Sequence, residues 1–257
     1  MVKLNRLGEV RKMNCEDYAK IVEYNNARDI IVEFQDYYKT HIHTTYQNFL
    51  RGTIKNPYCP SVYGVGMIGT KYKICTNHIE IKEYITWYNM LKRCFDKGYK
   101  EKYSTYLDVG CCNEWLYFEN FYEWLHSQNN FNKWFNGNGW SLDKDIIIKG
   151  NKVYTDNACC LVPSSVNNLF TKSNAIRGDL PIGVSKYGNM FQASCLNQFT
   201  GKKEYLGMYN TVENAFIAYK EYKERLIKQV AELEYSNGNI VEKCYYAMMK
   251  YTVDIDD

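Results

Sequence analysis

The sequence predicts a mixed α+β protein in three parts, and three observations carry this prediction. The beginning of the chain alternates short β-prone runs with turn residues, the middle holds two aromatic-rich segments with helical spacing, and the last third predicts three strands followed by one long helix. A chain of 257 residues is long enough for two or three small domains. We expect a small N-terminal β domain at 1–57, a linker at 58–77, a ββα core with flanking helices at 78–172, and a C-terminal three-stranded antiparallel sheet with a helix at 173–257.

Composition limits the possible classes only modestly. The formal net charge of +3 is too small to indicate nucleic acid by itself. Ten cysteines, in a chain with no signal-peptide pattern and no apolar run of about 18 residues, favour free thiols in a reducing cytoplasm and no membrane partner. The doublets Cys111-Cys112 and Cys159-Cys160 could in principle meet around zinc, but adjacent cysteines on a strand point in divergent directions. We therefore expect buried thiols and no zinc.

The first 77 residues give few functional signals. Runs at 19–24, 29–34 and 40–46 are β-prone, and His41 and His43 alternate on one strand face, where half-exposed histidines are commoner than a metal pair. The linker contains glycines in the order GxGxxG at 64–69, but no apolar strand precedes them and no capped helix follows. We therefore expect no nucleotide cofactor.

The middle part predicts two helices and then a hairpin. Apolar residues recur at helical spacing over 82–95 and 113–128, and an aromatic stripe of this kind is more typical of a core than of a base-stacking platform. Between 140 and 170, apolar alternation around Leu142 and Ile146, a Gly150-Asn151 turn and a second strand at 152–154 predict a β-hairpin. A helix that begins at Pro163 should follow.

The last third carries the strongest local pattern. Strands are predicted at 182–187, 190–197 and 203–208, with a Gly188-Asn189 turn between the first two. Thr211 has the character of a helix N-cap, and apolar residues after it recur at three- and four-residue spacing. One face of a long helix should therefore pack on the sheet.

This stretch resembles the AP2-type DNA-binding domain. The resemblance rests on Gly183-Val184, Phe191, Ala193, Leu206-Gly207, Thr211, Ala215, Ala218 and Tyr219. It implies that the sheet face turned away from the helix lies in the major groove of DNA, with contacts from Ile182, Ser185, Lys186, Ser194, Leu196, Lys203 and Tyr205. Plant members fill most of these positions with arginine and tryptophan, so the sequence preference stays open. The alternative is a packing module that binds no nucleic acid.

Residues 140–170 resemble the ββα-metal core of HNH-type endonucleases, and the pairing with an AP2-like tail resembles phage-borne homing endonucleases. The resemblance implies that Asp143 binds a divalent metal, that Asn157 is the loop asparagine that holds the hairpin, and that Asn167 is the ligand from the helix. Asp145 would face the same side as Asp143 and join the metal. Lys144 stands where the family has its general-base histidine.

The lysine decides what chemistry this core could perform. To act as a base near neutral pH, Lys144 would need its pKa lowered by about 3.4 units, or roughly 4.6 kcal/mol. It could instead stabilise the phosphate as a fixed cation while metal-bound water attacks.

The favoured function is Mg²⁺- or Mn²⁺-dependent cleavage of double-stranded DNA by a cytoplasmic protein, located in the host cytoplasm if it is phage-encoded. The alternative is a non-catalytic DNA-binding regulator, or a phage anti-defence protein, on a degenerate HNH scaffold.

Overall fold

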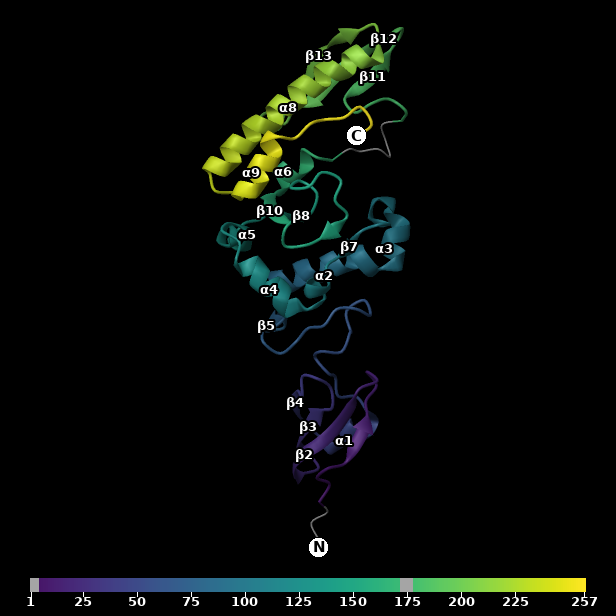
Figure 1. Cartoon of the computed structure of the whole chain (residues 1–257), viewed down its shortest axis with the longest axis vertical. Coiled ribbons are helices and arrows are strands. Elements are labelled where there is room, and N and C mark those ends of the chain that lie inside the picture. Colours follow the sequence, from purple (N-terminus) through teal and green to yellow (C-terminus); the bar gives the residue numbers. More distant parts are fainter. Residues whose placement is uncertain (1–4, 172–177) are drawn as a thin grey trace. The chain divides into compact units, whose positions relative to one another are not determined.

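The computed structural model describes residues 5–171 and 178–257 of the chain, shown in Figure 1. The chain forms two compact units: residues 1–107 with 113–122, and residues 108–112 with 123–257. Both units contain helices and antiparallel sheets in separate runs, so the expected α+β class is confirmed. The predicted boundary between residues 172 and 173 lies outside the described residues.

The β-prone runs of the first unit form a four-stranded antiparallel sheet in the order β1-β2-β3-β4. Its strands are β1 (Val10–Lys12), β2 (Tyr18–Asn26), β3 (Asp29–Phe34) and β4 (His41–Thr44). Ile30, Val32 and Phe34 alternate into a small core, where Phe49 of helix α1 (Tyr46–Arg51) joins them. Helix α1 begins after Thr45, whose hydroxyl accepts a hydrogen bond from the Asn48 N–H at 3.2 Å.

Helix α2 (Lys82–Phe95) has the predicted bounds. Its apolar side is buried, and the indole N–H of Trp87 donates to the Trp115 carbonyl at 2.7 Å. The short strands β5 (Cys75–Thr76) and β6 (Ile79–Glu80) precede it, and helix α3 (Lys97–Lys102) and the 3₁₀ turn η1 (Ser104–Tyr106) follow.

The single helix predicted over 113–128 is wrong, because the segment divides into a 3₁₀ turn, η2 (Asn113–Leu116), and helix α4 (Phe118–His126). The backbone of Met67 causes the break. Its N–H donates to the Leu116 carbonyl at 2.8 Å, and its carbonyl accepts from the Phe118 N–H at 2.9 Å. These long-range bonds replace helical ones at the junction.

In the second unit, the hairpin predicted between strands near 142–146 and 152–154 is also wrong. Strand β8 (Trp140–Asp143) pairs antiparallel with β10 (Cys160–Pro163), whereas β9 (Val153–Tyr154) pairs in parallel with β7 (Gly110–Cys111). The run from Cys160 to Val162 is fully buried, while Val153 is 41% exposed. Pairing β8 with β10 therefore buries more apolar surface than the local hairpin would. Helix α6 (Ser164–Asn168) follows β10, so strand, loop, strand and helix still occur in the expected order.

The last third has the predicted elements. Strands β11 (Val184–Tyr187), β12 (Met190–Leu196) and β13 (Lys203–Tyr209) form an antiparallel sheet in sequence order. The Thr211 hydroxyl caps helix α8 (Val212–Ser236) by accepting from the Asn214 N–H at 3.2 Å. Figure 1 shows α8 along one face of the sheet. After a turn, helix α9 (Glu242–Met249) packs against α8.

One hydrophobic core joins the region of β8, β10 and α6 to the sheet and α8. It contains Cys160, Val162 and Val166 from the first region, together with Ala193 and Ile227 from the second. Asn130, which precedes helix α5 (Phe131–Asn136), adds hydrogen bonds of 2.9 Å to carbonyls of both regions. Two parts that the sequence predicts as separate thus fold around shared side chains.

Candidate nucleic-acid interface and candidate metal site

The pairing of β11, β12 and β13 assigns each side chain to one of two sheet faces. Val184 lies opposite Ala193, and both are buried under α8. Their neighbours along each strand therefore point away from the helix. We call this surface the outer face, and it consists of Ser185, Tyr187, Met190, Gln192, Ser194, Leu196, Lys203, Tyr205 and Met208.

Large side chains on the outer face are exposed. Tyr187 is 71% exposed, Tyr205 62% and Leu196 53%. Lys203 is exposed opposite Leu196, and within β11, β12 and β13 the single acidic residue, Glu204, pairs with Cys195 on the other face. The outer face thus combines aromatic, aliphatic and cationic groups without a carboxylate, which is typical of a binding surface.

A bulge in β13 brings Tyr205 to this face. Ala193 pairs with Gly207 but Ser194 pairs with Tyr205, so Leu206 is the extra residue. Leu206 packs against the core, and Tyr205 points outward beside Ser194.

Most of the predicted DNA contacts lie on the outer face. Ser185, Leu196, Lys203 and Tyr205 are exposed there, whereas Ser194 belongs to the face but is only 5% exposed.

Two of the residues named for DNA contact lie elsewhere. Lys186 is opposite Phe191 on the side of the sheet that faces α8, and Ile182 packs against the core. The outer face also contains Tyr187, Met190, Gln192 and Met208, which the sequence did not lead us to name as DNA contacts. The Gly188-Asn189 turn sets the pairing of β11 with β12, and that pairing identifies the first three.

The candidate metal site centres on Asp143, the last residue of β8. Its Oδ1 accepts from the backbone N–H of Asp145 at 2.8 Å and of Ile146 at 2.7 Å, and the residue is 7% exposed. Burial, and secondarily the charge of Asp145, raises the pKa of Asp143 to about 6, against the lowering effect of these two hydrogen bonds. The buried carboxylate of Asp143 and the half-exposed carboxylate of Asp145 together form a place where a cation would be stabilised.

Lys144 already supplies a cation. It is 9% exposed, and its Nζ lies 3.0 Å from Asp145 Oδ2 and 3.3 Å from the Asn151 carbonyl. The Asn151 amide donates to the carbonyls of Lys144 and Val153, at 2.7 Å each, and so holds the loop closed. The resemblance assigned this loop-holding role to Asn157. The signal for Asn151 was the Gly150-Asn151 pair, which we interpreted as a hairpin turn.

The other predicted site residues are not brought to Asp143 by hydrogen bonding. Asn157 is exposed in the turn before β10, and Asn167 is half-buried in α6. Within 5–171 and 178–257, neither side-chain amide makes a hydrogen bond to Asp143, Lys144 or Asp145. Carboxylate oxygens of Asp143 and Asp145 are the donor type that Mg²⁺ takes. Asp145 Oδ2 is already paired with Lys144.

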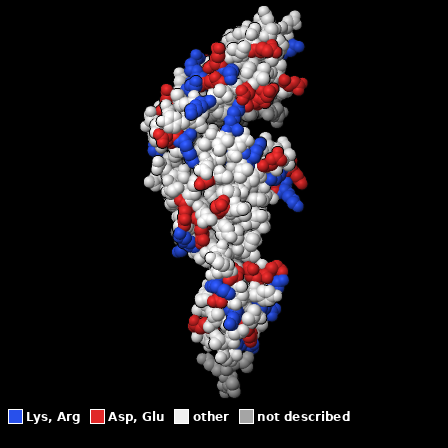
Figure 2. Space-filling model, in the orientation of Figure 1, with Lys and Arg blue, Asp and Glu red and all other residues white. Residues whose placement is uncertain are grey.

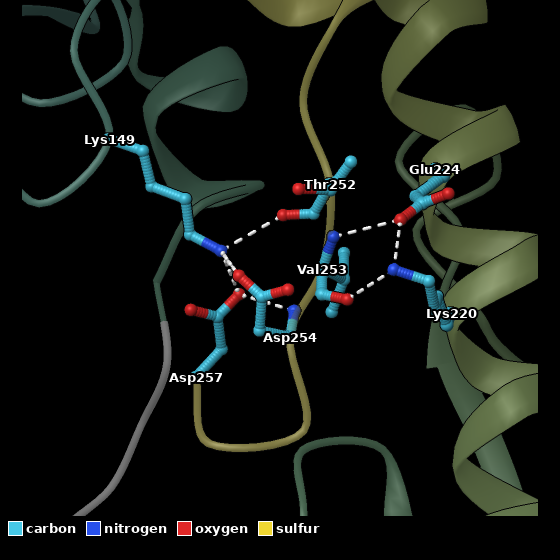
Figure 3. A network of polar contacts seen from close by, with 7 residues as sticks. All are labelled: Lys149, Lys220, Glu224, Thr252, Val253, Asp254 and Asp257. Carbon is cyan, nitrogen blue, oxygen red and sulfur yellow. Dashed lines mark hydrogen bonds and ion pairs between the residues drawn. The ribbon is translucent and has the colours of Figure 1, made fainter.

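A polar clasp fixes the loop that carries these residues, as Figure 3 shows. Lys149 donates to the Thr252 carbonyl at 2.9 Å and forms ion pairs with Asp254 at 2.6 Å and Asp257 at 2.7 Å. The same C-terminal segment is held to α8, because the Val253 N–H donates to Glu224 at 2.8 Å. The loop is thereby tied to the helix that supports the sheet.

The first unit holds a different group of metal-type ligands. Among the described residues, Cys15, Asp17 and Cys59 are the one set of three or more whose ligand atoms lie within 4.8 Å of one another. Burial, and secondarily Cys15, raises the pKa of Cys59 to about 11, so its thiol is protonated at neutral pH. Asp17 Oδ2 also accepts from the Asn56 amide at 2.8 Å. All ten cysteines are free thiols.

Comparison of the chain with protein-family models, curated proteins and solved structures gives no match in any of the three. Over the residues described, no helix combines the length and apolar character needed to cross a bilayer. Figure 2 shows lysine and arginine interspersed with aspartate and glutamate over the displayed face, in keeping with the small net charge.

Proposed function

We propose that the protein binds double-stranded DNA through the outer face of the sheet β11–β13. The observation that carries the proposal is the exposure of Tyr187, Tyr205 and Leu196 beside Lys203 on a face without carboxylates. β-strands can enter the major groove of B-DNA and present side chains to base edges. The AP2-like order of three strands and a helix suggests this mode of binding.

The chemistry of the outer face favours A·T base pairs. Gln192 lies on the central strand between Ser185 and Met208. A glutamine amide can bond adenine N6 and N7 together, and apolar side chains contact the thymine methyl group. Guanine is read mainly by arginine or lysine, and Lys203 is the one such residue that the outer face offers.

Fluorescence anisotropy of the full chain with labelled duplexes at low salt tests the proposal. Tyr187→Ala and Tyr205→Ala should each weaken binding about tenfold, as expected for exposed aromatic groups that become buried at an interface. Ile217→Ala is the matched control, because Ile217 is exposed on α8 and lies outside the outer face. Absence of binding to any duplex by the native chain would refute the proposal.

A second candidate function is divalent-metal-dependent DNA cleavage, which the approach of Asp145 to the buried Asp143 favours. Cleavage would need Mg²⁺ or Mn²⁺ held by these carboxylates, with the sheet delivering DNA to them. The ion pair between Lys144 and Asp145 favours the non-catalytic alternative, a DNA-binding regulator or anti-defence protein.

A plasmid assay with Mg²⁺, Mn²⁺ or EDTA separates these two candidates. Metal-dependent cutting that Asp143→Ala abolishes would identify an endonuclease. Binding without cutting would identify the non-catalytic protein. Free thiols throughout the chain agree with a cytoplasmic location for either function.

A further inference from the structure

A pocket of about 500 Å³ opens where β12 extends past β11 at one edge of the sheet. We call it the lysine pocket. Its wall includes Ser185, Ser194, Leu196 and Lys203, all of which also belong to the outer face, and Lys223 reaches it from α8. The pocket therefore borders the surface proposed to read DNA.

Among the described residues, those that line the lysine pocket include two cations and no anion. No aspartate or glutamate is among the described residues that line it, whereas Lys203 and Lys223 both are. Hydroxyl and amide groups of Ser185, Ser194 and Asn168 provide neutral polar partners in the same wall. This composition fits an anionic ligand that also accepts hydrogen bonds.

Lys223 is the unusual member of the pocket. Among the described residues, no hydrogen bond or ion pair reaches its ammonium group. Burial lowers the pKa of this lysine. Within the described part of the chain, Cys195 is the titratable group that acts on Lys223. Burial raises the pKa of that thiol, so Cys195 provides no thiolate at neutral pH. Lys223 is half-buried. A partly desolvated cation without a counter-charge costs stability, and an anionic ligand would reduce that cost.

We propose that the lysine pocket binds a phosphate group of the DNA backbone, with Lys223 and Lys203 as its counter-charges. This inference rests on the proposed DNA binding. Phosphate contacts position a protein on the duplex, while base contacts confer specificity. A phosphate held at the sheet edge would fix the register of Gln192 and its neighbours against the bases.

The test compares Lys223→Met with Lys228→Met in the full chain. Methionine keeps the length of the lysine side chain and removes the charge. Lys228 is exposed on the same helix, five positions further and about 140° around its axis, and it does not line the pocket. Anisotropy titrations with one mixed-sequence duplex are repeated over a range of NaCl concentrations, and thermal melts verify that each variant is folded.

Lys223→Met should weaken DNA binding about tenfold and reduce the slope of log K against log[NaCl] by about 0.9, the value for one phosphate contact. Lys228→Met should change neither quantity. Lys203→Met should repeat the effect of Lys223→Met from an exposed position where folding is not at risk.

Mass-spectrometric mapping of lysine acetylation gives an independent measurement. Duplex DNA should protect Lys223 from acetic anhydride and leave Lys228 reactive. If native protein and Lys223→Met bind DNA with equal affinity and slope, the inference is overturned while DNA binding stands. If the native protein binds no duplex, both the proposed function and this inference are refuted.

Discussion

The outer face of the sheet and the loop between β8 and β10 belong to the same compact unit, but their polar groups are arranged in opposite ways. On the outer face, large side chains and Lys203 are exposed with no carboxylate among them. Where β8 enters the loop, Asp143 accepts two backbone hydrogen bonds and Lys144 is paired with Asp145. One region presents exposed groups that can contact a ligand, whereas the polar groups of the other already bond within the protein.

This difference between the two regions means that the proposed DNA binding and the proposed cleavage place different demands on the protein. A DNA duplex could meet the outer face without rearrangement of the groups there. A metal ion in the loop would compete with Lys144 for Asp145, whose side chain is 43% exposed and pairs with the lysine through Oδ2. The proposed DNA binding therefore requires fewer rearrangements than the proposed cleavage.

The largest expected effect is on the free energy of unfolding, and it tests whether the sheet β11–β13 and the region of β8 and β10 unfold together. Gly183 has φ +80°, and a Cβ added there would lie 2.0 Å from the Tyr219 ring. Gly183→Ala should lower the free energy of unfolding by about 4 kcal/mol, because backbone strain and overpacking add. Urea unfolding measures this loss.

The control for this variant is Gly188→Ala. Gly188 also has positive φ, at +58°, but a Cβ there meets nothing within 4 Å, so the loss should be about 1 kcal/mol. Because β8, β10 and the sheet share a core, residues of both regions should lose hydrogen-exchange protection together. Separate transitions would show that the regions are independent domains.

The next effect concerns Lys144 and applies if the protein cleaves DNA. Lys144→Ala should lower the cleavage rate by about two orders of magnitude, as expected for loss of one preorganised charge. Lys144→His should preserve or raise the rate, since a histidine with a pKa of about 6.5 can take a proton from water. Plasmid nicking measures both.

Lys152→Ala is the control for Lys144→Ala, because Lys152 is an exposed lysine of the same loop. A native protein that is inert with every divalent metal tested would assign the loop to the non-catalytic alternative.

A smaller effect concerns Asp143 and the pH dependence of the free energy of unfolding. The pKa of Asp143 is raised from 3.8 to about 6, so the folded state retains a proton that the unfolded state has released. Stability therefore falls as pH rises from about 4 to about 6, and the full cost is present at neutral pH. Asp143→Asn keeps an oxygen that accepts the two backbone hydrogen bonds and removes the charge. It should stabilise the protein by about 3 kcal/mol at neutral pH and by little near pH 4.

Thermal melts at the two pH values measure this difference. Adding Mg²⁺ should stabilise the native protein but not the variant if Asp143 binds metal. A variant less stable than the native protein at neutral pH would contradict the electrostatic account.

The smallest effect tests base reading on the outer face. Gln192→Ala should reduce discrimination between A·T and G·C at one base pair by about tenfold while total affinity changes less, since a bidentate contact contributes about 1–3 kcal/mol of specificity. Selection from a random duplex library, followed by titration of the preferred site, measures the change. Unaltered base preferences would remove Gln192 from the reading surface.

Local signals in the sequence determined the elements of the last third. The Gly188-Asn189 turn, the alternation around Ala193 and the N-cap Thr211 each act over a few residues. Their consequences therefore appear where they were expected, as β11, β12 and the start of α8. The mixed α+β class and the bounds of α2 follow from the same kind of short-range periodicity.

Tertiary structure alone decided the arrangement of the middle region. Strand β8 pairs with β10 because Cys160 and Val162 of β10 lie in the common core, and the local turn signal at Gly150-Asn151 could not compete with that burial. The same long-range packing gives Asn151 its loop-holding bonds and brings Lys223 of α8 beside Cys195 of β12. Sequence periodicity specifies which residues are buried, but the partner of each buried strand depends on contacts distant in the chain.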